Sequence, residues 1–229
     1  LVHEQNGVLG RVNEVFARRV DRVACGTWPT ALPEGTEAVH TGNPIRSAVL
    51  DRAASPYTPP GDWPLKIVVM GGSQGARALN LRVPQALALM PPQTRPRVRH
   101  QAGRTLELAR RAYAAAGVEA QLEAFIADMP QAYADADLVV CRAGASTVAE
   151  LCAAGCASLL VPFPHAVDDH QTRNGEYLVD ARAARLVAES ELSPQRLCDE
   201  VQELLADRLY LIEMAESARR RAWTGSLTA

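Results

Sequence analysis

Short apolar runs alternate with stretches of helical periodicity along most of the chain. Apolar runs typical of buried strands occur at 65–70, 138–141 and 158–161, and further strands are expected at 97–100, 121–124 and 185–188. Apolar residues recur at the spacing of one helix face at 77–89, 105–116, 129–136, 193–205 and 209–222. Strands that alternate with helices in this way predict an α/β fold with a doubly wound parallel sheet.

The first 46 residues repeat this pattern on a smaller scale. Short strands are expected at 1–6, 22–25 and 38–40, with a helix at 8–20 and a turn at Gly42-Asn43-Pro44. Positions 51–64 hold four prolines and a glycine, with little periodicity. We therefore expect one unit at 1–46, a linker or surface loop at 47–64, and a second domain at 65–229. The start in mid-element at Leu1-Val2, without a signal-peptide pattern, suggests a piece of a longer protein.

Composition excludes several classes of protein. The net charge is −2, which offers no basic surface for nucleic acid. The five cysteines are an odd number and lie mostly in apolar stretches, so we expect buried thiols and neither a disulfide framework nor a metal site. No apolar run approaches the ~20 residues of a membrane-spanning helix.

Two glycine-containing turns each follow a predicted strand and precede a predicted helix. The first is Gly71-Gly72-Ser73-Gln74-Gly75-Ala76, and the second has Gly144 before Ser146 and Thr147. Backbone N–H groups and the helix dipole at such turns can bind phosphate. Because the carboxyl ends of parallel strands share one edge, we expect the two turns to converge.

Glu150 lies one helical turn beyond the second glycine turn. Its carboxylate could accept hydrogen bonds from the diol of a ribose, which gives a site for phosphate and ribose together. The alternatives are plain tight turns without a ligand, and a capping box formed by Thr147 and Glu150. The nicotinamide fingerprint, the hydrolase nucleophile elbow and the Walker loop are all absent.

Other polar residues are candidates for ligand contacts. The segment 165–174 carries Asp168, Asp169, His170, Gln171 and Asn174, which could bond several hydroxyls or could be a solvated loop. His3 and His100 lie near turns and are candidate ligand contacts, whereas His40 is interpreted as structural. The Asp135-Ala136-Asp137 pair resembles a metal motif but precedes a strand, so we expect a solvated helix end opposite the site.

Taken together, these motifs resemble the MurG family of bacterial glycosyltransferases. The matching segments, in order, are 3–6, 42–46, 71–76 with Leu79-Asn80, 123–129, 141–150 and 161–174. The resemblance implies a GT-B fold of two Rossmann-like halves with the active site in the cleft. The chain would then contain the complete C-terminal donor domain and the tail of the N-terminal domain.

The resemblance also implies an activity. The family transfers N-acetylglucosamine from UDP-N-acetylglucosamine to the 4-hydroxyl of the muramyl sugar in lipid I, forming lipid II with inversion. It needs no cofactor or tightly bound metal and works at the cytoplasmic face of the bacterial inner membrane. The membrane contact and the base would lie in an N-terminal region outside this sequence, so this chain alone is expected to bind the donor without transferring it.

Site residues follow from the same resemblance. Ser73 would contact the diphosphate, the backbone of Ile126 would read uracil, and Glu150 would take the ribose hydroxyls. Phosphate would lie at the start of the segment Ala145, Ser146, Thr147, Val148, Ala149 and Glu150. Gln171 and His170 would bond the sugar, while Asn6 and Arg46 would reach the donor from the opposite lip. His170 replaces a second glutamine of some members, and Arg182 stands where glycine is common.

Two other functions remain open at this stage. A non-catalytic donor-binding subunit that needs a partner chain would carry the same donor motifs. An epimerase acting on UDP-N-acetylglucosamine shares the GT-B fold but would need acidic catalytic residues in the cleft. The ordered transferase motifs count against the epimerase.

Overall fold

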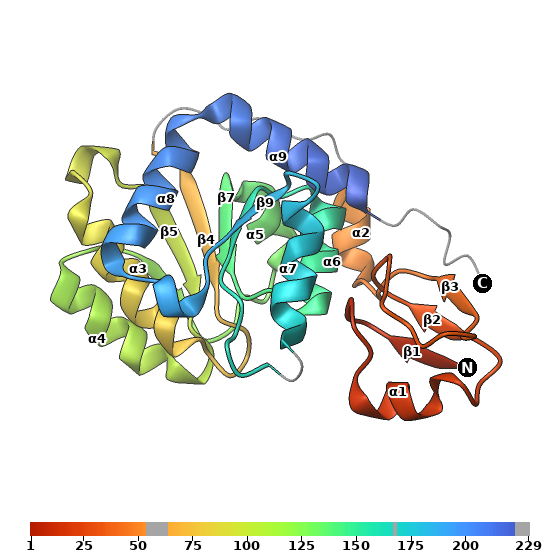
Figure 1. Cartoon of the computed structure of the whole chain (residues 1–229). Helices are drawn as coiled ribbons and strands as arrows, with labels where there is room; N and C mark the ends of the chain where they lie inside the picture. The colour runs from red at the N-terminus through yellow and green to blue at the C-terminus, as the bar shows by residue number, and fades with distance from the viewer. Residues whose placement is uncertain (54–63, 167–168, 223–229) are drawn as a thin grey trace.

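The computed structural model describes residues 1–53, 64–166 and 169–222. A six-stranded parallel sheet has the order β6-β5-β4-β7-β8-β9. Its strands are β4 (Lys66–Met70), β5 (Arg97–Gln101), β6 (Gln121–Glu123), β7 (Leu138–Cys141), β8 (Ser158–Leu160) and β9 (Ala184–Leu186). A three-stranded parallel sheet has the order β1 (Val2–Glu4), β2 (Val23–Cys25) and β3 (Ala38–His40). It lies with α1 (Arg11–Ala17) to one side of the larger sheet (Figure 1).

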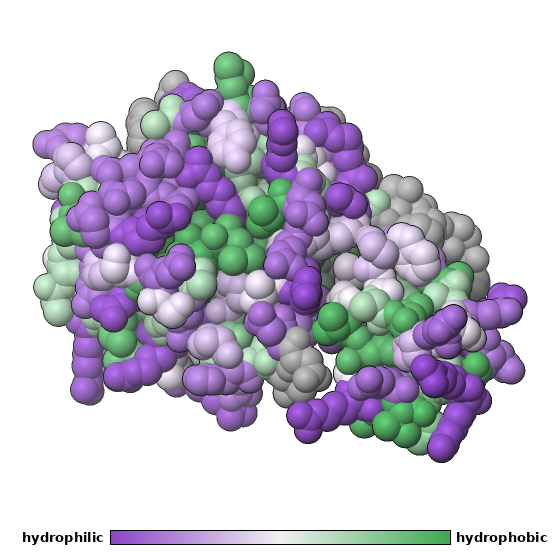
Figure 2. Space-filling model, in the orientation of Figure 1, coloured by the Kyte–Doolittle hydropathy of each residue, from purple (hydrophilic) through white to green (hydrophobic). Residues whose placement is uncertain are grey.

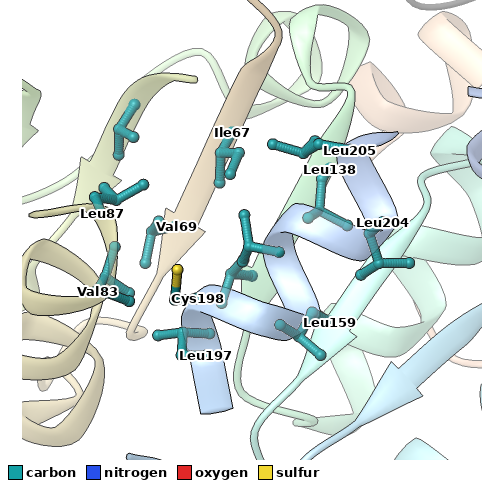
Figure 3. Packing of buried hydrophobic residues seen from close by; sticks show 14 of the residues in the cluster. Ile67, Val69, Val83, Leu87, Leu138, Leu159, Leu197, Cys198, Leu204 and Leu205 are labelled. Carbon is teal, nitrogen blue, oxygen red and sulfur yellow. The ribbon is translucent and has the colours of Figure 1, made fainter. Parts of the chain in front are cut away.

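The larger sheet is covered on both faces because successive strand residues point in opposite directions. Ile67 and Val69 of β4 pack with α3 (Arg77–Leu89), α4 (Leu106–Ala116) and α8 (Pro194–Ala206), as Figure 3 shows in part. Val68 and Met70 pack on the other face with α5 (Met129–Asp135), α6 (Ala145–Ala154) and α7 (His170–Val179). Each fully buried leucine in these cores contributes about 1.5–3 kcal/mol. Burial on both faces explains why the central strands β4, β7 and β8 appear as largely apolar runs.

Helix boundaries follow local capping chemistry. Ser193 caps α8 by accepting a hydrogen bond from the N–H of Arg196, with Pro194 in the first position. Asp207 caps α9 (Arg208–Arg221) in the same way. The five cysteines are buried and free, as predicted from their apolar surroundings.

The predicted linker at 47–64 is partly wrong. Residues Ser47–Ala53 form α2, whose Val49 is fully buried in the core beside α5 and α6. Because the apolar pattern of this segment is only two turns long, packing and not periodicity accounts for the helix. The rest of the predicted loop, 54–63, lies outside the described residues.

The surface differs between the two ends of the molecule. Polar side chains dominate the face of the larger unit in Figure 2, while apolar surface is visible toward α1, where Val12 and Val15 are exposed. In the part of the chain that the structure describes, no helix is long and apolar enough to cross a bilayer.

Candidate functional site

The larger sheet has a switch point between β4 and β7. From β4 the chain winds outward through β5 and β6, and then returns to add β7, β8 and β9 on the other side. Met70 is paired with Cys141, so the two strands end side by side. Ligand sites in open parallel sheets form at the carboxyl edge of such a switch point. A cavity of about 800 Å³ opens there, between the loop after β4 and the start of α6.

Six of the predicted site residues line this cavity: Arg46, Ser73, Ser146, Thr147, Glu150 and Gln171. The two glycine turns therefore converge as predicted. The other six lie outside its described wall: Asn6, Ile126, Ala145, Val148, Ala149 and His170.

The first glycine turn is fixed by packing against the connection between β5 and α4. Gly75 has φ +82°, and a Cβ there would lie 2.1 Å from the Thr105 hydroxyl oxygen. Asn80, buried in α3, donates hydrogen bonds to the same Thr105 hydroxyl and to the Ala102 carbonyl. Close packing against Thr105 explains why glycine is required at position 75, whether or not a ligand binds. Ser73, by contrast, lies on the cavity wall.

The second turn presents the start of α6 to the cavity. Gly144 is the N-cap and supplies no side-chain hydrogen bond. Val148 donates the first intrahelical bond, to the Gly144 carbonyl, so the amides of the three residues before it have no place in the helical ladder. Ser146 and Thr147 line the cavity, while Val148 packs in the core. Since Gly144 is the N-cap, Thr147 and Glu150 do not form the capping box that was the alternative.

Glu150 is held by two partners from different elements. Arg46, just before α2, donates from Nε to Oε1 at 2.8 Å and from Nη2 to Oε2 at 2.9 Å. Tyr133 of α5 donates its hydroxyl to Oε2 at 2.9 Å. Hydrogen bonding to Glu150 raises the pKa of the Arg46 guanidinium, so this side chain stays charged. Tyr133 was not predicted as a site residue, and no local motif marks it.

A second network joins the small sheet to the large one. Asn174 of α7 is buried and accepts a hydrogen bond from the Gly7 N–H. Its amide nitrogen donates to the Asn6 side-chain oxygen and to the Ala143 carbonyl. Asn6 in turn donates to the carboxylate of the buried Glu4. Both ends of the Asn6 amide therefore serve in the protein's own network in this structure.

The other predicted site residues differ in how closely they approach the cavity. Ile126 is fully buried, and its amide donates to the Gln101 side chain, so its backbone does not reach the cavity wall in this structure. Gln171 accepts a hydrogen bond from the Phe163 N–H at the cavity wall. His170 begins α7, outside that wall. Asp168, a predicted hydroxyl contact, lies outside the described residues.

The prediction that His100 contacts a ligand is wrong. The side chain is fully buried, and its Nδ1 lies 3.0 Å from the Tyr113 hydroxyl. Burial lowers the pKa of His100 to about 3, because the imidazolium would lose its hydration. It is therefore a neutral core residue. Its side chain points from β5 into the core, and the neighbouring turn in the sequence gives no sign of this orientation.

Charged groups on the cavity wall favour an anionic ligand. The wall includes three arginines, Arg46, Arg77 and Arg142, against Glu150 and Glu189. Arg142 was not predicted, although its place directly after β7 marks it. It pairs with Glu189 and also donates to the carbonyls of Val161 and Pro162, which fixes the floor beside α6.

Candidate metal ligands do not cluster in the part of the chain that the structure describes. Among residues 1–53, 64–166 and 169–222, no cluster of three or more His, Cys, Asp or Glu side chains is arranged to hold a metal ion. Asp137 accepts a hydrogen bond from the Lys66 N–H at the start of β4. This is the sheet edge opposite the cavity, where the sequence placed the Asp135-Ala136-Asp137 pair.

Comparison with known proteins agrees with this architecture. Residues 66–224 match the model of the glycosyltransferase family 28 C-terminal domain. The chain is 52% identical over 222 residues to the UDP-N-acetylglucosamine--N-acetylmuramyl-(pentapeptide) pyrophosphoryl-undecaprenol N-acetylglucosamine transferase of Nitrosococcus oceani, covering 96% of this chain and 62% of that protein. The protein of the same name from Marinobacter nauticus is 47% identical, with 97% and 61% covered. The chain thus spans about 60% of the length of these curated relatives.

Solved structures show the same fold. The crystal structure of Acinetobacter baumannii MurG superposes with a TM-score of 0.78 at 37% identity, covering 96% of this chain and 62% of that one. CalG4, the calicheamicin glycosyltransferase, has a TM-score of 0.57 at 20% identity, covering 92% and 50%, which shows the fold alone. Two parallel sheets with a cavity at the switch point are thus a GT-B glycosyltransferase fold. Within that class, the chain belongs to glycosyltransferase family 28.

Proposed function

We propose that this chain forms the donor-binding part of an inverting glycosyltransferase that transfers N-acetylglucosamine from its UDP donor to lipid I, giving lipid II in peptidoglycan synthesis. The observation that carries the proposal is the cavity at the switch point. It brings together a serine from the first glycine turn, the uncapped start of α6, and Glu150 one turn further along. The names of the relatives supply the sugar and the acceptor.

Each part of the donor has a matching group in this assignment. The diphosphate lies at the start of α6 beside Ser73, where the N-terminal amides of the helix can donate to it. Glu150 accepts from the ribose, and the backbone at Ile126 reads the uracil edge. Gln171, with His170 beside it, contacts the sugar hydroxyls. Asn6 belongs to the opposite lip, where Glu4 and Asn174 hold it.

The chemistry is displacement of UDP by the acceptor hydroxyl at the anomeric carbon. Negative charge develops on the diphosphate as the glycosidic bond breaks, and the dipole of α6 and the wall arginines stabilise it. We place the base that takes the hydroxyl proton outside this sequence, on the acceptor side. Residues 1–46 then belong to the acceptor-side domain and 65–229 form the donor domain. We place the complete enzyme at the cytoplasmic face of the inner membrane, as a peripheral protein that touches it through its N-terminal domain.

Calorimetric titration tests this function directly. UDP-N-acetylglucosamine is expected to bind the chain more tightly than UDP-glucose. Glu150→Ala removes a charged acceptor and is expected to cost about 1.5–3 kcal/mol, or about 10- to 150-fold in affinity. Glu107→Ala is the matched control, because Glu107 forms an exposed ion pair with Arg111 on α4 and does not line the cavity.

Absence of donor binding, or equal binding by wild type and Glu150→Ala, would contradict the assignment. A separate assay with lipid I tests the division of labour. The chain alone is expected to form no lipid II, and turnover by the isolated chain would refute that part of the proposal.

A further inference from the structure

Three of the acceptor positions on Glu150 are occupied by the protein itself. A carboxylate offers about four lone-pair positions, two on each oxygen. Arg46 takes one on each oxygen, and Tyr133 takes the second on Oε2. One position remains, on Oε1. A ribose diol that bonds both oxygens needs one position on each, so one of the two partners must leave when such a ligand binds.

The exposure of the partners indicates which of them leaves. The side chain of Arg46 is 48% exposed and lies on the cavity wall. Tyr133 of α5 also lines the cavity but is only 4% exposed, so its hydroxyl would lose its partner with little access to water. Arg46 can turn to solvent or to another anion, because about half of its side chain is already exposed, whereas the Glu150 side chain is only 13% exposed.

A diphosphate in the same cavity would offer Arg46 a new partner. An α-helix rises 1.5 Å per residue, so Ser146 and Thr147 lie roughly 4.5–6 Å from Glu150 along the axis of α6. A phosphate at the start of α6 is therefore within the swing of an arginine side chain. Guanidinium binds phosphate in the same two-pronged geometry that it uses for a carboxylate.

We propose that Arg46 occupies the ribose-binding position of Glu150 in the free protein and moves to the diphosphate when a nucleotide sugar binds. This inference rests on the proposed function and assigns Arg46 a role in specificity. A nucleoside must displace Arg46 without replacing its ion pair, whereas a nucleoside diphosphate supplies a new anion. The exchange therefore selects ligands that carry ribose and diphosphate together.

The Arg46→Met variant distinguishes the proposed movement of Arg46 from a purely structural role in which Arg46 only holds Glu150 in place. Uridine, followed by NMR chemical-shift titration, is expected to bind the variant about two- to fivefold more tightly than the wild type, because its competitor is gone. UDP-N-acetylglucosamine is expected to bind the variant at least about fivefold more weakly, because a charged hydrogen bond to phosphate is lost. Arg22→Met is the matched control: Arg22 forms an exposed ion pair with Glu37 in the small sheet, so neither ligand should respond.

Salt dependence gives an independent measurement on the unaltered chain. Because salt screens the Arg46 guanidinium, whose side chain is 48% exposed, uridine affinity of the wild type should rise between 50 and 500 mM NaCl, on the order of twofold, and that of Arg46→Met should not. Uridine binding that is equal or weaker in the variant, or that falls with salt in the wild type, would overturn the exchange. If the wild type binds UDP-N-acetylglucosamine but uridine gives either of these opposing results, the exchange is wrong and the proposed function stands. If the wild type binds no UDP-N-acetylglucosamine, the proposed function and the exchange fail together.

Discussion

Asn174→Ala tests the link between the two sheets. The amide accepts from Gly7 at 3.2 Å and donates to Asn6 at 3.0 Å and to Ala143 at 3.3 Å. The side chain is 1% exposed, so water cannot easily replace it. A net loss near 1 kcal/mol for each bond, with a penalty for the groups left unpaired, predicts a destabilisation of about 2–4 kcal/mol. Because Asn174 bonds to Gly7 and Asn6, part of this destabilisation should be confined to the junction between the two sheets and should not reach the core of the larger sheet.

Two measurements report the destabilisation caused by Asn174→Ala. Urea unfolding gives the total free energy, and amide hydrogen exchange of the peptide covering residues 2–13 reports the junction. We expect faster exchange in that peptide, and little change in peptides from β4 and β7. Gln195→Ala is the control, because Gln195 makes an exposed hydrogen bond to Asp199 and should cost under about 0.5 kcal/mol. If Asn174→Ala costs no more than this control and exchange at residues 2–13 is unchanged, Asn174 does not hold the two sheets together.

Three further substitutions give separate tests. Burial opposes ionisation of Glu4, but hydrogen bonds from Gly10, Asn6 and Asn13 outweigh the effect of burial and lower the pKa of its carboxyl from the usual 4.5. The ionised carboxylate therefore stabilises the fold above pH 4.5, and this stabilisation is lost as the pH falls through the lowered pKa. Glu4→Gln should thus cost about 1–3 kcal/mol at pH 7 and less at pH 3 in urea unfolding, and a pH-independent cost would contradict this. Arg182→Gly should add about 0.5–1 kcal/mol in the same assay, because Arg182 has φ +57°, and a loss would contradict this. Gly75→Ala should cost at least about 2 kcal/mol in thermal unfolding, because its Cβ would strike Thr105, and an unchanged Tm would contradict this.

Most of the fold could be predicted because strand and helix periodicities are local properties. Each strand of the larger sheet lies within two residues of its predicted bounds. The signal is strongest for β4, β7 and β8, because burial on both faces makes these strands largely apolar. Residues Ser47–Ala53 are the exception. Their helix depends on the contact of Val49 with α5 and α6, which no local pattern encodes.

The candidate site was only partly predictable for the same reason. Ser73 and Thr147 follow strands, so parallel pairing alone brings them to one cavity. The partners of Glu150 could not be found this way, because Arg46 and Tyr133 approach from two other elements. His100 was misinterpreted because a turn nearby in sequence does not show which way a strand residue points.

A crystal structure of the chain with UDP-N-acetylglucosamine would locate both the donor and the Arg46 side chain. We expect density for the donor in the cavity between Ser73 and the start of α6, with the ribose at Glu150. We also expect the Arg46 guanidinium to have left Glu150 for the diphosphate. Donor density elsewhere on the molecule would contradict the site itself. A ribose in place beside an unbroken Arg46–Glu150 ion pair would contradict the exchange.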